Sequence, residues 1–504
     1  MSKKAFYFVV FLILLAICFS PLIGAQNRQA AFPRLEPDPK ALEYFVLGKR
    51  DHGYSWQELA EISLWASGDT SLSNMQKIRE MVANLNNSSE LPASGRERAE
   101  FILTFLHGNI LRTYSLFQTR VDTVFTNGRF NCVSSAVLYM ILCKSAGINT
   151  SGVITRDHAF IIVHIDNQNI DVETTNRFGF EPGNRREFHD QFGRTGFTYV
   201  PAQNYRDRQT ISQIELISII FNNRIAELER ANRFAEAVPL AIDRTAMLLG
   251  NLSSDETFYS SDQRNRTEAI FINPRRDLLD RLINYGASLL RSNREEETLV
   301  WAVSASVMYP DSDRWPELIM TAVNNRIVRF IRDRRPAEAR NFLETNRLFL
   351  SLDDYSTLDA VLVDTELLNR AQQINDVDEG NAVIEAIQQA QTNGRLNARR
   401  ATELITFAVQ KTASILSAAP NPDWREAILF LENAVSSFGT NREFEQALRT
   451  YRGNLAALYH NRFAAEWNRQ NFDEAQRILN EGLAEFPNDR QLLSNKEIVE
   501  RQNR

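Results

Sequence analysis

Residues 130–148 read FNCVSSAVLYMILCKSAGI, and this stretch decides the fold around it. The segment after Cys132 is apolar on nearly every side of a helix, which is typical of a helix that is buried all round. Gly147 stands where a glycine often ends a helix. We therefore predict a buried helix over residues 132–146, with Cys132 at its start.

Two β-branched segments with alternating character follow this helix. They read VITRDHAFIIVHI at 153–165 and NIDVETT at 169–175, and the polar residues 166–169 between them are typical of a turn. This pattern predicts an antiparallel hairpin. A stretch rich in glycine, proline and aromatic residues continues to Tyr205. The sequence therefore predicts a compact α+β domain over residues 96–205.

Cys132 stands at a position where a thiolate would be stabilised. The first backbone N–H groups of a helix have no partner within it, and together with the helix dipole they favour an anion. A reactive cysteine also needs a base. The candidate is His158, at the head of the segment HAFIIVHI. Cys143 lies in an apolar context and is expected to be a buried core residue.

The base needs a third group that accepts a hydrogen bond from its other ring nitrogen. Asp171 and Glu173 lie two residues apart on the returning strand, and therefore on one face. The turn is expected to be centred between Asn167 and Gln168. This register places Glu173 nearer than Asp171 to His158, and the glutamate side chain is longer. Glu173 is therefore preferred as the third group, with Asp171 as the second choice.

The blocks FNCVSSAVLYMILCKSAGI, DHAFIIVHI and IDVETT resemble the transglutaminase-like superfamily, whose papain-related members use a cysteine, a histidine and an acid. The match covers roughly residues 94–205. The resemblance implies Cys132 as the nucleophile and His158 as the general base and acid. In many relatives a threonine follows the acid one residue later, which fits Glu173 with its two threonines. Their Asp-Pro-Thr form is absent here, so the third member stays open between Glu173 and Asp171.

The resemblance implies acyl transfer. The Cys132 thiolate would attack a carboxamide or peptide carbonyl, His158 would protonate the leaving amine, and water or an amine would resolve the thioester. The Cys132 backbone N–H and one further donor would hold the oxyanion. Tyr114 and Gln118 precede the nucleophile and carry suitable groups, but the spacing singles out neither.

Composition excludes several other classes. The chain has 504 residues, 43% hydrophobic and 24% charged, the balance of an ordinary folded protein. A formal charge of −6 disfavours a nucleic-acid-binding protein. Three cysteines exclude a disulfide-stapled scaffold and a cysteine-rich zinc module. Eleven helical residues would separate Cys132 from Cys143 by about 16 Å, so both thiols are expected to be free. His158 and His164 lack a third metal ligand, so neither a metal nor another cofactor is expected.

The first 25 residues have the three regions of a secretory signal. Two lysines precede an uncharged run over residues 5–19, and the small pair Gly24-Ala25 follows. This run is shorter than the ~20 residues that a membrane-spanning helix needs. We therefore expect cleavage after Ala25 and export to the periplasm or out of the cell. An uncleaved membrane anchor is the alternative, and a lipid on Cys18 is disfavoured because Ile17 is not small.

Two segments precede the α+β domain. Residues 26–40 are polar and contain three prolines, which suits an extended linker. Residues 41–95 are expected to be a helical N-terminal extension, with helices opened by serines at Ser55 and Ser94.

Residues 206–504 are expected to be helical, and only 7 of the 20 glycines lie there. An Asn-Arg pair is followed at constant spacing by a Glu-Ala pair within 223–237, 325–339 and 461–475. Short antiparallel helices that cross at an alanine resemble tetratricopeptide-like repeats. A generic helical bundle is the alternative. Bacterial transglutaminase-like proteins joined to such repeats have a similar layout.

The sequence thus favours an exported thiol acyltransferase or hydrolase that acts on peptide or protein carboxamides. Its helical repeats would bind a protein partner. The alternative is a catalytically inactive peptide-binding or scaffold protein of the cell envelope, which keeps the fold without the reaction. Neither the substrate nor the acyl acceptor follows from the residues.

Overall fold

The computed structural model describes residues 32–155, 158–182, 208–250, 273–418 and 422–502. This part of the chain is mostly helical, with a small sheet region. It divides into two compact units, Met1–Ala322 and Val323–Arg504. The first unit therefore contains helices from the predicted repeat region as well as the predicted α+β domain. The predicted signal over residues 1–25 lies outside the described residues. Among the described helices, none combines the length and the apolar character needed to cross a membrane.

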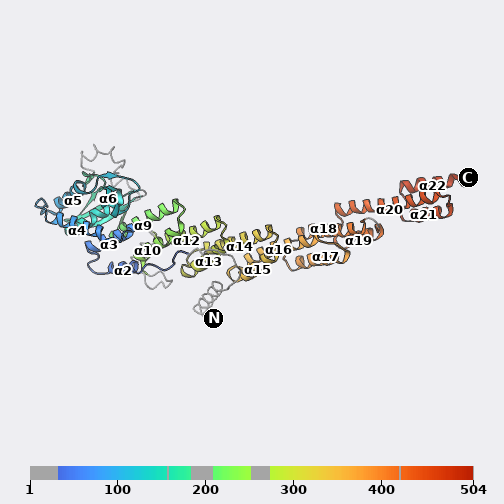
Figure 1. Ribbon diagram of the computed structural model, residues 1–504, viewed down its shortest axis with the longest axis horizontal. Coiled ribbons are helices and arrows are strands. Elements are labelled where there is room, and N and C mark those ends of the chain that lie inside the picture. Colours follow the sequence, from blue (N-terminus) through green and yellow to red (C-terminus); the bar gives the residue numbers. More distant parts are fainter. Residues whose placement is uncertain (1–31, 156–157, 183–207, 251–272, 419–421, 503–504) are drawn as a thin grey trace, which may run out of the picture. The chain divides into compact units, whose positions relative to one another are not determined.

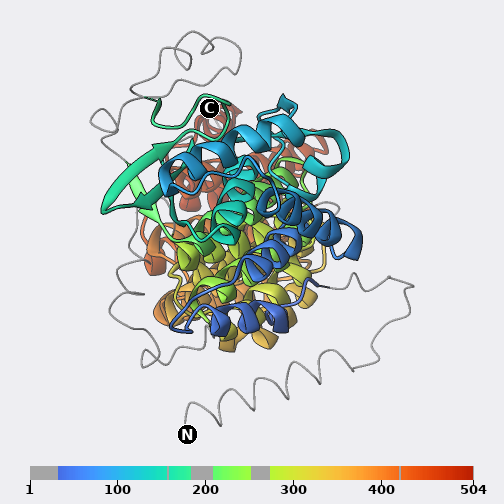
Figure 2. The ribbon, with the colours of Figure 1, turned by 90° about the vertical axis from the view of Figure 1, so that its left-hand side faces the viewer.

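Helix α7 (Cys132–Ser145) is the centre of the first unit. Every residue from Cys132 to Cys143 is buried, as predicted for a helix that is apolar all round. Gly147 follows with φ +75°, the left-handed conformation that glycine tolerates best. Helices α3 (Trp56–Ser67), α5 (Gly95–Asn109) and α9 (Gln213–Arg230) and two strands of the sheet pack around α7. In Figure 2 the strands lie on the left of the first unit, and the blue N-terminal helices lie on the right.

A four-stranded antiparallel sheet lies against α7. Its strands run in the order β5-β4-β3-β6. The predicted hairpin is present, because β4 pairs with β5 and Ile165 faces Gln168. Its turn consists of Asp166 and Asn167, both with positive φ. The turn is therefore centred one residue earlier than the sequence predicted. The strands are β3 (Asn149–Ile154), β4 (Ala159–Ile165), β5 (Gln168–Val172) and β6 (Gln209–Ile211).

The segment VITRDHAFIIVHI contributes to two strands, and β4 begins directly after His158, close to the predicted head of the strand HAFIIVHI. Ile154 pairs with Ala159, so the chain reverses direction between β3 and β4. The Thr155 N–H donates to the His158 carbonyl across this reversal, at 2.9 Å. β6 was also missed, because the sequence predicted helix from residue 208 onward. A strand of three residues with one buried apolar side chain, Ile211, carries too little alternation to be recognised.

Helices α3, α4 (Leu72–Asn86), α5 and α6 (Val121–Asn127) pack against α7, and α5 also contacts β4. The Ser55 and Glu58 side chains and backbones form the predicted capping box. The helix predicted to begin after Ser94 does so, but without a side-chain cap. β1 and β2 form a short parallel pair before α7. The elements are α2 (Pro39–Leu47), α3 (Trp56–Ser67), α4 (Leu72–Asn86), α5 (Gly95–Asn109), β1 (Thr113–Tyr114), α6 (Val121–Asn127) and β2 (Arg129–Phe130).

The rest of the first unit is a series of helices that pack in sequence (Figure 1). α9 also packs on α3 and α7, so the first helical hairpin after the sheet contacts the central helix directly. These helices are α9 (Gln213–Arg230), α10 (Phe234–Leu249), α12 (Pro274–Arg291), α13 (Glu295–Met308) and α14 (Arg314–Arg332), the last of which runs into the second unit.

The second unit is helical throughout its described residues. Two apolar clusters form its core, one around α16–α18 and one around α20–α22. Its elements are α15 (Pro336–Thr345), the short 3₁₀ helix η4 (Arg347–Phe349), α16 (Leu352–Gln372), α17 (Val377–Thr392), α18 (Ala398–Leu416), α19 (Trp424–Phe438), α20 (Arg442–Asn468), α21 (Phe472–Glu485) and α22 (Arg490–Gln502).

The three predicted repeats have a common turn. Each Asn-Arg pair lies within the first helix and each Glu-Ala pair opens the second. Asn232, Arg334 and Gln470 occupy the same place in the three turns, with φ of 58°, 59° and 63°. The alanines of the three Glu-Ala pairs are almost fully buried. The regular spacing in the sequence therefore reflects one helix–turn–helix geometry.

Candidate active site

The cap of α7 presents Cys132. Asn131 Oδ1 accepts hydrogen bonds from the Val133 and Ser134 N–H groups, both at 3.0 Å. The Ser134 hydroxyl in turn accepts a hydrogen bond from the Asn131 N–H at 3.0 Å. Among the described residues, no acceptor is paired with the Cys132 N–H, as expected for the first residue of a helix. Cys132 is 8% exposed and borders a pocket.

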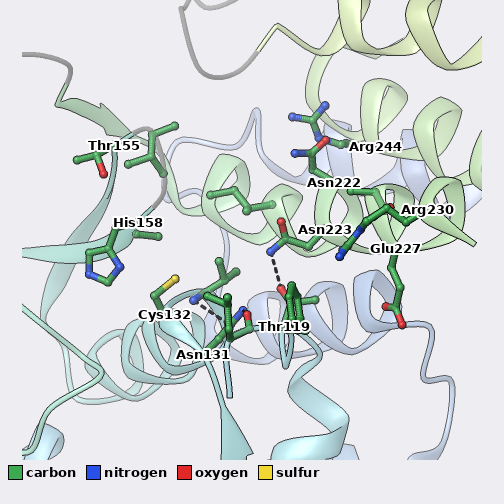
Figure 3. Close-up of a pocket in the computed structure, with 17 residues that line it drawn as sticks. Thr119, Asn131, Cys132, Thr155, His158, Asn222, Asn223, Glu227, Arg230 and Arg244 are labelled. Atoms are coloured by element: carbon green, nitrogen blue, oxygen red, sulfur yellow. Dashed lines mark hydrogen bonds between the residues drawn. The ribbon is translucent and has the colours of Figure 1, made fainter. Parts of the chain in front are cut away.

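His158 faces Cys132 from the reversal between β3 and β4. Figure 3 shows the imidazole ring and the cysteine sulfur turned toward each other. The Cys132 thiol is one of the groups that raise the pKa of His158. The His158 Nε2 atom lies 2.5 Å from Glu173 Oε2, so Nδ1 is the ring nitrogen that remains for the thiol.

Glu173 follows the last residue of β5 and is almost completely buried. Its second carboxylate oxygen, Oε1, accepts from the Thr175 N–H at 3.1 Å and from the Thr175 hydroxyl at 2.6 Å. The Glu173 N–H donates to the Gly179 carbonyl at 2.8 Å. Both carboxylate oxygens therefore have partners, which a buried charge requires.

The charged forms of His158 and Glu173 stabilise each other. Burial alone would lower the pKa of His158, but the Glu173 carboxylate and the bonds to Cys132 and Glu173 raise it to about 10. Burial would raise the pKa of Glu173, but the neighbouring imidazolium and the Thr175 bonds hold it below its usual range. The buried site therefore favours a protonated His158 beside an ionised Glu173.

Asp171, the second choice for the third group, has another partner. Its carboxylate oxygens lie 2.5 and 2.7 Å from the two terminal nitrogens of Arg208. The Arg208 guanidinium lies 4.9 Å from the centre of the Phe160 ring. The Phe160 ring in turn stacks against the His158 ring, with 6.2 Å between the two ring centres. Asp171 is thus linked to His158 through Arg208 and Phe160.

The two residues considered as oxyanion donors lie in different settings. The Gln118 amide donates to the Arg120 carbonyl at 3.3 Å, while its backbone carbonyl accepts from Ser134. Burial and the charges of Cys132 and Glu173 raise the pKa of Tyr114, so its hydroxyl stays protonated. Neither residue lines the pocket at Cys132.

The remaining sequence candidates are the cysteines Cys132 and Cys143 and the β4 histidine, His164. Both Cys132 and Cys143 are free, as predicted. Burial raises the pKa of Cys143, which lies in the core. His164 is exposed and bonds to Ser151 and Asn169. In the part of the chain that the structure describes, no group of three metal-ligating side chains occurs.

Cys132 and His158 open into a pocket of about 660 Å³. One wall comes from the loop before α6, the start of α7 and the β3–β4 reversal. The opposite wall comes from α9 and α10 (Figure 3). Leu116 and Phe117 lie at its edge, 57% and 72% exposed. The α9 and α10 residues of the wall are Ile219, Asn222, Asn223, Ala226, Glu227, Arg230 and Arg244.

Reasoning from sequence missed this helical wall. In the sequence Asn223 belongs to one of the Asn-Arg repeats, and in the structure its amide donates to the Thr119 hydroxyl at 3.0 Å beside the pocket. α9 follows the nucleophile by some eighty residues of intervening chain, and its pattern is that of an ordinary amphipathic helix. The one feature of the sequence that points to this wall is a group of polar residues on α9, whose other face is buried in the core.

Comparison with known proteins adds no relative. No family model matches this chain, and no curated protein matches it.

Proposed function

We propose that this chain is a transglutaminase-like thiol acyltransferase or hydrolase, which acts on peptide or protein carboxamides through a thioester on Cys132. The supporting observation is the alignment of three buried groups. Cys132 at the start of α7 faces His158, and the other nitrogen of His158 bonds to Glu173 at 2.5 Å. A thiol, a base and an orienting acid in this order are the parts that cysteine-dependent acyl transfer needs.

The first half of the reaction forms the thioester. The Cys132 thiolate attacks the carbonyl carbon, and the carbonyl electrons move onto oxygen. When the tetrahedral intermediate collapses, the carbon–nitrogen bond breaks. The protonated His158 donates its proton to the leaving nitrogen, which departs as ammonia or an amine. Glu173 keeps the imidazole oriented throughout, because its carboxylate is itself held by Thr175.

The second half returns the site to its starting state. Water or an amine attacks the thioester carbonyl, and His158 takes the proton that the attacking group loses. The carbon–sulfur bond then breaks and the thiolate leaves, again paired with a protonated His158. The product is a carboxylic acid with water as acceptor and a new amide with an amine as acceptor.

The start of α7 would stabilise the oxyanion in both halves. The Cys132 N–H is directed out of the first turn, where helix dipoles and unpaired N–H groups favour negative charge. Asn131 holds the next two N–H groups, so the Cys132 N–H is the one that remains for the substrate.

Export and partner binding belong to the same proposal. The signal expected over residues 1–25 would place the enzyme in the periplasm or outside the cell, where it would meet envelope or secreted proteins. The helical hairpins would bind a protein partner, as stacked helical repeats commonly do.

The thioester is the testable product. The full chain is mixed with 4-nitrophenyl acetate, quenched with acid and weighed by mass spectrometry. We expect one acetyl group on Cys132, removable by hydroxylamine, in the native chain and in the matched variant Cys143→Ala. Cys132→Ser should lose it. Equal acetylation of Cys132→Ser and the native chain would refute the proposed function.

A further inference from the structure

The pocket wall opposite Cys132 carries a cation that the reaction itself does not use. We propose that Arg230 of α9 binds a carboxylate on the acyl donor, so that the preferred substrates carry an acidic group beside the acyl group that reacts. This inference rests on the proposed function, since it assigns the substrate class of the same site.

The Arg230 side chain is held with its free edge toward the pocket. Its Nε donates to the Ala226 carbonyl one turn earlier, at 3.1 Å. Its guanidinium carbon lies 5.3 Å from the centre of the Phe117 ring. Figure 3 shows the guanidinium directed toward the side of the pocket that holds Cys132. These contacts restrain the side chain before any ligand arrives, which lowers the entropy lost on binding.

The neighbouring arginines are neutralised, whereas Arg230 is not. Arg233 pairs with Glu236 at 2.6 Å, and Arg281 pairs with Glu229 at 3.4 Å. Arg244, which also lines the pocket, pairs with Asp277 at 2.8 Å. Around Arg230, no carboxylate of the described chain lies within ion-pair distance. Its positive charge is therefore left for a ligand.

The nearest possible competitor on the same helix is Glu227, one turn before Arg230. Both residues line the pocket, but they form no ion pair. Figure 3 shows the Glu227 carboxylate turned away from the direction taken by the Arg230 guanidinium. A carboxylate bound by Arg230 would therefore lie nearer to the Arg230 guanidinium than to the Glu227 carboxylate.

The chemistry of the free edge selects a planar anion. With Nε bonded to Ala226, the two terminal nitrogens of Arg230 remain as a fork. Such a fork matches the two oxygens of a carboxylate, and two parallel charged hydrogen bonds are stronger than neutral ones. A neutral carboxamide would offer one acceptor oxygen in place of two. The preference should therefore be for an acid over its neutral counterpart of equal length.

The rest of the pocket has room for the connecting chain. Its volume of about 660 Å³ exceeds what a single carboxamide group fills. The exposed side chains of Leu116 and Phe117 offer an apolar edge between the nucleophile and Arg230. An acyl group at Cys132, an apolar linker along this edge and a carboxylate at Arg230 would occupy the pocket together.

The experiment compares acyl donors that differ only in this charge. The 4-nitrophenyl half-esters of adipic, pimelic and suberic acid, which are too long to expel nitrophenolate through a five- or six-membered cyclic anhydride, are each paired with the neutral 4-nitrophenyl alkanoate of the same carbon number. In each case the thiolate forms a carbon–sulfur bond and 4-nitrophenolate leaves. The rate of nitrophenolate release in a single turnover gives the acylation rate, and mass spectrometry locates the acyl group. Glutathione with the same pairs supplies the intrinsic ratio of rates.

We expect at least one chain length at which the half-ester acylates Cys132 about tenfold faster than its neutral partner, after division by the glutathione ratio. Arg230→Gln should reduce this preference to the glutathione value. Arg233→Gln removes the same charge from an exposed arginine outside the pocket and should leave the preference intact.

Any result other than the one expected would overturn the carboxylate site at Arg230. A native preference equal to that of glutathione at every length would overturn it, and so would a preference that survives Arg230→Gln. In both cases Cys132 would still be acylated, so the proposed function would stand. If neither the half-esters nor the neutral esters acylate Cys132, the proposed function fails and the substrate class fails with it.

Discussion

His158 Nε2 lies 2.5 Å from Glu173 Oε2, and the two side chains are only 4% and 2% exposed. A buried carboxylate so close to an imidazole stabilises the protonated ring, and the protonated ring can stabilise a thiolate on its other side. The histidine thereby links an acid with no access to substrate to the cysteine that borders the pocket.

Removing the charge of Glu173 should slow the reaction of Cys132. Glu173→Gln keeps the size and a hydrogen-bond acceptor but loses the charge that supports the imidazolium. We expect alkylation of Cys132 by iodoacetamide at mildly acidic pH to slow by about a hundredfold. The rates of the variant and the native chain should converge at alkaline pH, where any thiol ionises. Equal rates at acidic pH would show that Glu173 does not act on the pair.

Asp171→Asn provides the comparison between the two carboxylates. Asp171 binds Arg208, whose guanidinium lies over the Phe160 ring that stacks on His158. We expect its loss to lower the alkylation rate several-fold at most, because the His158–Glu173 bond is left in place. A loss as large as that of Glu173→Gln would assign the orienting role to Asp171.

The stability of the first unit should depend on pH through His158. Its pKa in the folded chain is about 10, above the ordinary value of 6.5. A raised pKa contributes stability that is complete below about pH 6.5 and is lost as the pH rises toward 10. The free energy of unfolding of the native chain relative to His158→Gln should therefore fall over this window. We would measure it by urea unfolding, and a difference that stays constant would contradict the ion pair.

Gly179 should be required for the placement of Glu173. A Cβ atom at residue 179 would lie 1.9 Å from the Glu173 carbonyl oxygen, so the turn after β5 would have to move. We expect Gly179→Ala to slow Cys132 acylation at least about tenfold, because small displacements of a catalytic group are costly. Gly108→Ala is the control, since its Cβ meets nothing within 4 Å in α5. It should leave acylation unchanged and stability within about 1 kcal/mol. Equal effects of the two substitutions would contradict this role.

Destabilising the second unit should leave the reactivity of Cys132 unchanged. Ala475 is fully buried where α21 packs on its neighbours. Ala475→Asp should therefore destabilise the second unit by about 4 kcal/mol. Ala484→Asp places the same charge on an exposed position of α21 and should change stability by about 0.5 kcal/mol or less. Limited proteolysis would detect the opening of the second unit, while the alkylation rate of Cys132 should stay native in both variants. A loss of Cys132 reactivity in Ala475→Asp alone would show that the two units are coupled.

Local sequence signals were sufficient for the central elements of the fold. The apolar segment after Cys132 is long enough to specify a buried helix, and the β4–β5 hairpin has strong alternation around a polar turn. Hairpin geometry also brings a residue just beyond β5 close to one just before β4, which is how Glu173 meets His158.

Features that depend on distant contacts were not predictable in this way. The pairing of β3 with β4, in which Ile154 faces Ala159, is a contact that the alternation of the segment does not specify. The position of α9 depends on its packing against α3 and α7, which no local periodicity encodes. The sequence alone therefore gives Arg230 no recognisable role, because its place in the pocket depends on where α9 packs.

The most direct test of the central claim is the ultraviolet absorbance of a thiolate, followed as a function of pH in the native chain and in Cys132→Ser. The difference between the two spectra reports the charge of Cys132 alone. We expect a thiolate signal at neutral pH that is sustained by the His158–Glu173 pair and lost in His158→Gln. A difference signal that is absent at neutral pH, or that His158→Gln leaves unchanged, would contradict the claim that these three residues form an activated thiol.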